Sequence, residues 1–354
     1  MNPQRMSRVA EERLDQALEF ARGGRSLELK RDLQGARARY EDALALLADL
    51  DPTPLLAKLL RWNGSIHRDL GEIDRADELY GESYRISERT GATGGQASAL
   101  NCRAVIAQRR GDVDEAMTLY RRAARLATEA GEIRLAGMIE QNLGVLANIR
   151  GDLDGALVRY RAALRAFREV ADDEAVSWVL NNMGMLLTDL GLSNRAEKCF
   201  LEGLEIAEAR RDATMEGVLR TNYTECLIAM RRWDEARQNL ALGLGIAHAG
   251  SDRAREGEAL KLYATLEREL ENVTQAEQHV EAALDIGRGV DDPLLVAECL
   301  RERGRLRLMR GRPAEAEQDW LEARAGFGAL NATLDADRTM AMIEALRRGG
   351  EDRT

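Results

Sequence analysis

A ten-residue pattern returns along the chain every forty residues, and this period limits the possible folds more than any other feature. The stretch GDLDGALVRY at 151–160 follows GDVDEAMTLY at 111–120 and GEIDRADELY at 71–80. Eight copies align in phase, starting at residues 31, 71, 111, 151, 191, 231, 271 and 311. A period of about 20–50 residues is typical of solenoids, whose neighbouring units share one continuous core. We therefore expect a repeat array rather than separate globular domains.

Small and large residues hold fixed positions inside each copy. The sixth position is always Ala, and the tenth is large and apolar: Tyr40, Tyr80, Tyr120, Tyr160, Phe200, Leu240, Val280 and Trp320. One small residue follows three positions later, and another lies twelve residues before the Ala: Gly24, Gly64, Ala104, Gly144, Gly184, Thr224, Ala264 and Gly304. Spacings of three and four place residues on one helical face, so each repeat is predicted to contain two packed helices.

The turn between the two predicted helices also has a recurring composition. Glycines suited to a helix end with positive φ occur at Gly71, Gly111, Gly151, Gly191 and Gly311. Polar residues follow them as expected N-caps of the second helices: Asp74, Asp114, Asp154, Asn194, Asp234 and Thr274. The second helices are accordingly expected to begin near residues 34, 74, 114, 154, 194, 234, 274 and 314.

The small, Ala, large and small residues at offsets 0, 12, 16 and 19 resemble the tetratricopeptide repeat, over about residues 7–330. The forty-residue period is similar to that of the longer-helix branch found in kinesin light chains, Pins-type adaptors and bacterial regulators. The resemblance implies an all-α superhelix, a solenoid of about eight helix-turn-helix repeats with the first helices on its concave side. We expect the solenoid at 1–330, a capping helix at 331–348 and a disordered tail at 349–354. Gly23 and Gly24 are expected to interrupt the first helix.

Composition narrows the function classes. The chain has 354 residues, of which 45% are apolar and 32% charged, with a formal net charge of −10. This acidic balance argues against a general affinity for nucleic acids. The sequence has neither a signal peptide nor the roughly 18 apolar residues in succession of a membrane span, so we expect a cytoplasmic protein without membrane partners. The four cysteines are expected to be reduced core residues: Cys102, Cys199, Cys226 and Cys299.

No motif supports catalysis. His67, His248 and His279 are far apart in the sequence and lack neighbouring Cys/His clusters, so neither a metal site nor a nucleophile is predicted. The stretch ERTGATGGQ at 88–96 lacks the G-K-[ST] of a phosphate-binding loop and is predicted to be a flexible connection between repeats. We expect no enzyme activity and no cofactor.

The candidate binding residues are those that the repeat itself does not require. By the resemblance, they occupy the exposed positions of the first helices, which face the groove. In the central repeats these positions are sparsely charged, which indicates a contact surface: Met138, Asn142, Val145, Asn148, Trp178, Asn181, Asn182, Met185, Val218 and Asn222. Further candidates lie toward the two ends: Arg61, Arg68, Asn101, Lys261 and Arg301.

Asn142, Asn182 and Asn222 occupy the same position in three consecutive repeats. An amide both donates and accepts hydrogen bonds, so such a row could hold the backbone of a peptide while Met and Trp side chains receive its side chains. The alternative is that these residues only help to order the first helices.

These observations predict a non-catalytic scaffold that binds a protein or peptide in its concave groove. Two alternatives stay open: a bacterial signalling sensor that acts on a separate output protein, and self-association through the solenoid ends, where Leu14, Leu18 and Phe20 form an apolar face. The co-chaperones of this family bind acidic tails with a Lys and an Asn four residues apart. That partner class is disfavoured, because Trp62 follows Lys58 and Thr265 follows Lys261 at this spacing.

Overall fold

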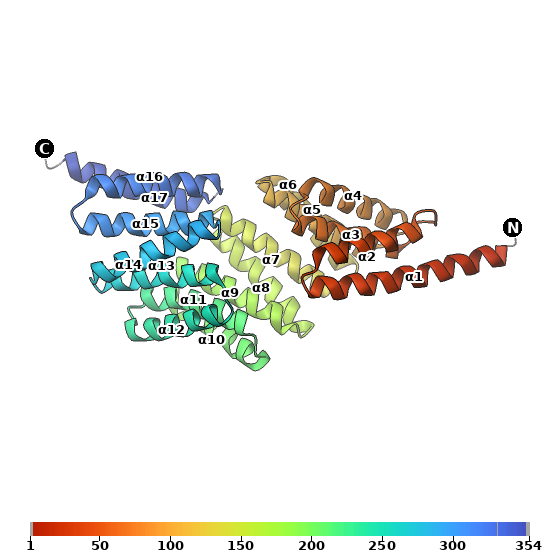
Figure 1. The fold of residues 1–354 in the computed structure, drawn as a ribbon, viewed down its shortest axis with the longest axis horizontal. Coiled ribbons are helices and arrows are strands. Elements are labelled where there is room, and N and C mark those ends of the chain that lie inside the picture. The colour runs from red at the N-terminus through yellow and green to blue at the C-terminus, as the bar shows by residue number, and fades with distance from the viewer. Residues whose placement is uncertain (1–2, 331, 352–354) are drawn as a thin grey trace. The chain divides into compact units, whose positions relative to one another are not determined.

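The protein is all-α, as predicted. The computed structural model describes residues 3–330 and 332–351, and all of the regular structure in this part of the chain is helical (Figure 1). The first nine helices are α1 (Pro3–Leu29), α2 (Leu33–Leu47), α3 (Pro54–Asp69), α4 (Ile73–Arg89), α5 (Thr93–Arg109), α6 (Val113–Glu129), α7 (Ile133–Ile149), α8 (Leu153–Glu169) and α9 (Asp173–Asp189). The others are α10 (Ser193–Arg210), α11 (Ala213–Ala229), α12 (Trp233–Ala249), α13 (Arg253–Glu269), α14 (Val273–Gly289), α15 (Pro293–Met309), α16 (Pro313–Ala329) and α17 (Thr333–Glu351).

The chain divides into two compact units. Unit 1 is Met1–Leu143 and unit 2 is Gly144–Thr354, so the boundary falls within α7. In each unit, consecutive helices pack as hairpins, for example α3 with α4 and α5 with α6 in unit 1, and α11 with α12 and α13 with α14 in unit 2. The chain thus buries its apolar faces between neighbours along the sequence, as expected for a repeat array.

The recurring small and large residues pack against each other within each hairpin. A Cβ added to Gly64 would lie 2.8 Å from the ring of Tyr80, and one added to Gly184 would lie 2.6 Å from the ring of Phe200. Both rings are fully buried. The small residue of the first helix therefore makes room for the large residue of the second, which explains their fixed separation of sixteen residues.

Helix α1 is continuous, which corrects the expected interruption at Gly23 and Gly24. Gly24 lies where the other first helices carry their small residue, and an added Cβ there would lie 2.6 Å from the ring of Tyr40. Packing against Tyr40 offsets the modest cost of glycine in a helix, which is about 1 kcal/mol. The stretch at 88–96 is also largely helical, because α4 ends at Arg89 and α5 begins at Thr93.

Most helix ends recur at intervals of twenty residues and carry a left-handed residue, whereas α2 ends at Leu47 with a right-handed C-cap, Ala48. Within the described residues, seven glycines have positive φ: Gly71, Gly91, Gly111, Gly131, Gly151, Gly191 and Gly311. Seven other residues adopt the same conformation: Arg31, Ala171, Arg211, Arg231, Ser251, Glu271 and Asp291. The predicted positive φ of Gly71, Gly111, Gly151, Gly191 and Gly311 is thus confirmed.

The N-caps lie two residues before their predicted positions. Asp112 and Asp152 cap α6 and α8, accepting hydrogen bonds from the amides of Glu115 and Gly155 at 3.0 and 2.9 Å. The predicted cap Asp114 lies inside the first turn of α6, where its charge is still favourable to the helix dipole. The turn is therefore shorter than expected, because the left-handed residue is followed directly by the cap.

Helix α17 follows the last hairpin and packs against α16. Ile343 is buried there. The helix continues to Glu351, three residues past the expected end of the capping helix at 348. Residues 352–354, which belong to the expected tail, lie outside the described residues.

Candidate functional site

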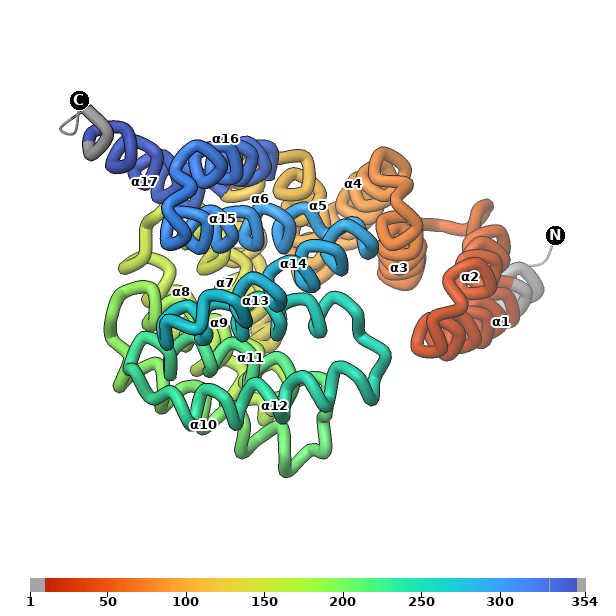
Figure 2. The backbone as a smooth tube through the Cα atoms, turned by 60° about the vertical axis from the view of Figure 1, so that its left-hand side comes forward, coloured from red at the N-terminus to blue at the C-terminus, as the bar shows by residue number. Residues whose placement is uncertain are grey.

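The first helices of neighbouring hairpins in unit 2 contact each other, and their shared face is the candidate site. Helix α9 contacts α11, α11 contacts α13, and α13 contacts α15. Figure 2 shows α9, α11 and α13 in succession on the same side of their hairpins. In a curved stack the inner layer is the more closely spaced one, so this face is the inner, concave one. Arg338 of α17 is 3.4 Å from Asp189 of α9, so the last helix reaches the same face.

An apolar and amide-rich surface lies on α9 and α11, which we call the central patch: Trp178, Asn182, Met185 and Asn222. Trp178 and Met185 are 37% and 43% exposed, so both of these large apolar side chains are partly open to solvent. Asn182 and Asn222 are half-buried. An exposed apolar group with polar neighbours is typical of a surface that binds a partner.

A buried amide fixes the orientation of Asn222. Its Nδ2 donates to Oδ1 of Asn181 at 2.8 Å, and Asn181 in turn directs its Nδ2 to the sulfur of Met185 at 3.6 Å. Asn181 is only 3% exposed. Within the described residues no donor bonds to Oδ1 of Asn222, so that oxygen is left available as an acceptor. Asn181 therefore positions the patch rather than contacting a ligand.

Unit 1 contains a second amide pair of the same kind. The Nδ2 of Asn142, on α7, donates to Oδ1 of Asn101, on α5, at 3.3 Å. Asn101 is buried and Asn142 is half-buried. In both pairs the buried Asn lies 41 residues before the half-buried Asn that it binds. The same arrangement of amides therefore occurs twice in the fold.

Not every predicted groove residue is accessible. Val218 is only 2% exposed and belongs to the core, because α11 buries at this position the face that α9 exposes at Trp178. Asn101 and Asn181 are buried partners of the exposed amides, as described above. The α7 candidates are all half-buried: Met138, Val145 and Asn148.

The predicted cations of unit 2 are engaged in ion pairs. Lys261 lies 2.6 Å from Glu298, and Arg301 lies 2.6 Å from Asp335 of α17. Burial alone would lower the pKa of Lys261, but the attraction of Glu298 and Glu225 raises it above its ordinary value. These two cations hold consecutive first helices together, so their charges are largely neutralised within the protein.

Glu225 differs from these paired groups. Its side chain is exposed to solvent, yet the surrounding protein raises its pKa above the ordinary value, with desolvation as the main cause and Lys261 as the main opposing charge. A carboxyl group that touches water but is crowded by protein is expected on a concave surface. Glu225 borders the central patch, three residues after Asn222 on α11.

In unit 1 the predicted cations have different surroundings. Arg68 is paired with Asp69, 2.8 Å away. Lys58 lies over the ring of Trp62, with its nitrogen 4.7 Å from the ring centre. Within the described residues, neither Lys58 nor Arg61 has a carboxylate within ion-pair distance.

Other features of the chain offer little for chemistry. The described residues contain no group of three or more His, Cys, Asp or Glu side chains arranged to hold a metal ion. Burial raises the pKa of the Cys102, Cys226 and Cys299 thiols, which keeps them protonated and unreactive. Of the helices in the described part of the chain, none is both long and apolar enough to cross a membrane.

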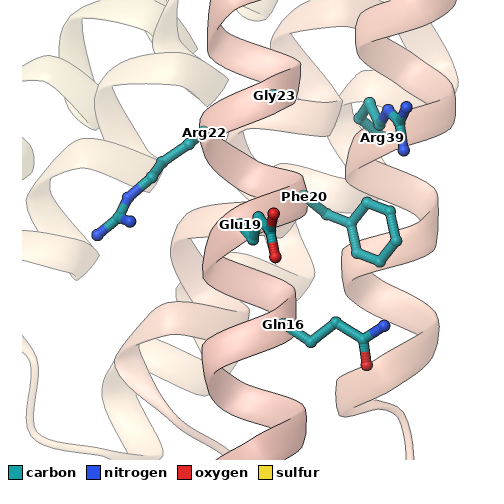
Figure 3. Close-up of a pocket in the computed structure, with 6 residues that line it drawn as sticks. All are labelled: Gln16, Glu19, Phe20, Arg22, Gly23 and Arg39. Carbon is teal, nitrogen blue, oxygen red and sulfur yellow. The ribbon is translucent and has the colours of Figure 1, made fainter.

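A shallow pocket of about 500 Å³ lies at the N-terminal edge of unit 1. Figure 3 shows Phe20 of α1 directed toward α2, where the guanidinium of Arg39 lies 5.4 Å from its ring centre. Leu18 of the predicted apolar end is 37% exposed, whereas Leu14 and Phe20 are half-buried. The apolar surface of this end is therefore smaller than the sequence predicts.

Comparison with known proteins identifies the repeat. Two family models, both described as tetratricopeptide repeat, match residues 96–130 and 135–209. No curated protein sequence matches the chain. A Rap protein complexed with competence and sporulation factor has a similar structure, with a TM-score of 0.63 and 13% identity over 98% of this chain and 100% of that one.

Two further solved structures share the fold. One is the Rap conjugation gene regulator of the plasmid pLS20 in complex with the Phr* peptide, with a TM-score of 0.55 and 17% identity over 77% of this chain and 73% of that one. The other is aspartyl phosphate phosphatase F from Bacillus subtilis, with a TM-score of 0.57 and 10% identity over 96% of this chain and 94% of that one. At these identities the likeness shows the fold alone.

Proposed function

Because the chain is a tetratricopeptide-repeat protein, we propose that it is a non-catalytic scaffold whose concave first-helix face binds a peptide or helix of a partner protein. The central patch is the proposed centre of the binding surface. Its apolar side chains would receive side chains of the partner, and its amides would bond to the partner's backbone.

The observation that carries this proposal is the fixed orientation of Asn222 beside two exposed apolar side chains. Because Asn181 holds its amide nitrogen, the free Oδ1 of Asn222 can accept a hydrogen bond from a backbone N–H of the partner. Trp178 and Met185 lie on α9, the same helix as Asn182, and the sulfur of Met185 is 3.4 Å from Nδ2 of Asn222. Polar groups that are oriented in advance lose less entropy on binding, and large apolar side chains provide most of the binding energy.

The similar structures support a peptide as the ligand. One of them is a complex with the Phr* peptide and another a complex with competence and sporulation factor. They also favour a second candidate function, a bacterial sensor in which binding of a signal changes the action on a separate output protein. One similar structure is named a phosphatase, so an assay for phosphatase activity accompanies the binding test.

The test is affinity capture from a lysate of the native host with three forms of the full chain. The first is the wild type, the second carries Asn142→Ala, Asn182→Ala and Asn222→Ala, and the third is a matched control. The control carries Gln238→Ala, Gln278→Ala and Gln318→Ala, which remove three exposed amides at equivalent positions of second helices α12, α14 and α16.

The expected result is a protein retained by the wild type and by the control but lost from the Asn variant. Removal of the Asn222 side chain leaves the buried oxygen of Asn181 without its donor and is expected to cost about 1 kcal/mol of stability. Circular dichroism is therefore needed to check that the three forms have equal helicity and that lost binding does not result from unfolding. Equal retention by all three forms would show that the amides only order the helices.

A further inference from the structure

The cations of unit 2 follow a simple rule of pairing between repeats. Lys261 binds Glu298, 37 residues later, and Arg301 binds Asp335, 34 residues later. In both cases the acid comes from the next first helix. Arg61 of unit 1 occupies the same repeat position as Lys261 and Arg301, three residues before the small residue. The same pairing would therefore be expected for Arg61.

The acids that this rule requires are missing from unit 1. The positions 37 and 34 residues after Arg61 are Ser98 and Gly95. A second cation, Lys58, lies one helical turn before Arg61 and rests on Trp62. Within the described residues neither cation has a carboxylate partner. Two positive charges thus lie beside the place where other repeats carry an acid.

That place is a pocket. It has a volume of about 340 Å³, which is within the usual range for small-molecule sites, and all of its lining residues belong to unit 1. Lys58 and Arg61 come from α3, Ser87 from α4, and Gly95 and Ser98 from α5. The pocket therefore brings two cations that lack a carboxylate partner together with hydroxyl groups and with the start of a helix.

The start of α5 adds hydrogen-bond donors. Its N-cap residue, Ala92, has no side chain that could cap the helix. Within the described residues, the backbone amides of Gly94 and Gly95 have no acceptor, and both residues line the pocket. Free amides and the positive end of the helix dipole both favour a bound anion.

Ser87 provides an independent indication of a ligand. Its side chain is fully buried, and its Oγ has no hydrogen-bond partner in the described part of the chain. A Cβ added to Gly95 would lie 2.6 Å from this oxygen, so the glycine keeps space open above the hydroxyl. A buried hydroxyl without a hydrogen-bond partner costs about 1–3 kcal/mol of stability, unless a group of a ligand forms the missing hydrogen bond.

One carboxylate opposes an anion at this site. Glu132, just before α7, lines the pocket, and a Cβ added to Gly94 would lie 3.0 Å from its Oε1. Glu132 is exposed at the rim, so it can turn toward solvent. Its negative charge is expected to weaken anion binding. Removing that charge should therefore strengthen binding, whereas removing a cation should weaken it.

We propose that this pocket binds a phosphate group. Its donors are the amides of Gly94 and Gly95, the hydroxyls of Ser87 and Ser98, and the charges of Lys58 and Arg61. They are more numerous than the two oxygens of a carboxylate can accept, whereas a phosphate has three terminal oxygens for them. The inference is independent of the peptide-binding function proposed above, because it rests on residues of unit 1 that the central patch does not include.

The test is isothermal titration of the full chain with inorganic phosphate, at constant ionic strength. Arg61→Met is expected to weaken binding by about tenfold or more, since it removes a charge-assisted hydrogen bond. Ser98→Glu restores the missing acid and is expected to abolish binding by pairing with Arg61. The matched control is Ser26→Glu, which adds the same charge at an exposed position of α1 and should leave binding unchanged. Glu132→Gln should strengthen binding about threefold or more by removing a repulsive charge.

The outcomes separate the possibilities. Binding that survives Ser98→Glu as well as it survives Ser26→Glu overturns the proposal, and so does absence of binding to the wild type. Circular dichroism of each variant excludes misfolding, and the gain expected for Glu132→Gln cannot arise from misfolding. Titration with O-phosphoserine then identifies the source of the phosphate: tighter binding than inorganic phosphate indicates an ester, and equal binding indicates free phosphate.

Discussion

Arg61 in unit 1 and Lys261 in unit 2 occupy the same position of their repeats, yet they have opposite surroundings. Lys261 lies 2.6 Å from Glu298, whereas in the described residues Arg61 has no acid within ion-pair distance. The difference comes from the next repeat, which supplies Glu298 in one case and Ser98 in the other. In this protein, whether a first-helix cation at this position forms an ion pair thus depends on the residue that the next first helix supplies.

The largest expected effects come from the glycines that pack against buried rings, one in each unit. Gly64→Ala places a Cβ 2.8 Å from the ring of Tyr80 in unit 1, and Gly184→Ala places one 2.6 Å from the ring of Phe200 in unit 2. Because both rings are buried, each variant is expected to lose about 2 kcal/mol of unfolding free energy. Denaturant unfolding measures this loss.

Binding assays on the same two variants sharpen the comparison. Gly64→Ala should weaken phosphate binding while partner capture is retained, and Gly184→Ala should do the reverse. Equal losses of both activities in both variants would show that the two surfaces do not act separately.

The next effect tests the pairing itself. Lys261→Met leaves Glu298 and Glu225 without their cation and is expected to cost about 1–2 kcal/mol, less than for a fully buried pair because both partners retain some contact with solvent. Arg61→Met removes no ion pair and should change stability by less than about 0.5 kcal/mol. Thermal unfolding of the two variants in parallel provides the measurement. Similar losses would mean that Arg61 contributes as much to stability as the ion pair of Lys261 does.

The units also differ in how their helices end. The left-handed positions of unit 1 are mostly glycine, while unit 2 uses six other residues there: Ala171, Arg211, Arg231, Ser251, Glu271 and Asp291. Arg211 has a φ of 56° and a ψ of 37°. Since a side chain in this conformation is strained by about 1 kcal/mol, Arg211→Gly should raise the unfolding free energy by roughly 0.5–1 kcal/mol. Gly71→Ala, at a φ of 82°, should lower it by about 1 kcal/mol or more. Opposite shifts of the denaturation midpoint are expected, and shifts of the same sign would contradict this account.

The fold could be predicted from sequence because each repeat has a small residue and, sixteen positions later, a large apolar residue that packs against it. Residues similar to Gly184 and Phe200 occur at every step of forty residues, so the pattern is much less open to chance than a single match would be. The second helices begin within one residue of the expected positions, but their N-caps were harder to place. Asp112 and Asp114 are the same residue type, so composition does not decide which of them is the N-cap. The structure selects Asp112, because α6 begins at Val113, two residues after the left-handed Gly111.

The candidate site was less predictable, because its chemistry depends on contacts between repeats. Nothing in the local sequence distinguishes Asn181 from Asn182, although one is a buried support and the other half-exposed. Val218 occupies the same repeat position as Trp178 but is buried. The pairing of cations with acids 34 or 37 residues later was a signal in the sequence that comparison of repeats could have found.

The smallest expected effect concerns Glu225, the crowded carboxyl beside the central patch. Its pKa is raised above the ordinary 4.5, mainly because surrounding protein desolvates the charged form, while Lys261 acts in the opposite direction. The folded protein therefore holds this proton more tightly than the unfolded chain does. The resulting stabilisation is complete below the unfolded pKa and is lost as the pH rises through the folded pKa.

Glu225→Gln, which is neutral at every pH, should therefore be more stable than the wild type at pH 8 and equal to it at pH 4. Because the side chain is exposed, solvent screening limits the gain to about 0.5 kcal/mol, or roughly 1–2 °C in melting temperature. Glu205→Gln, at an exposed position of α10, is the matched control for the loss of one negative charge. A gain of the same size at both pH values would place the effect in packing rather than in the charge. A gain confined to high pH would instead identify Glu225 as a carboxylate that the protein keeps on its concave face at a cost, where a cationic group of the partner could offset it.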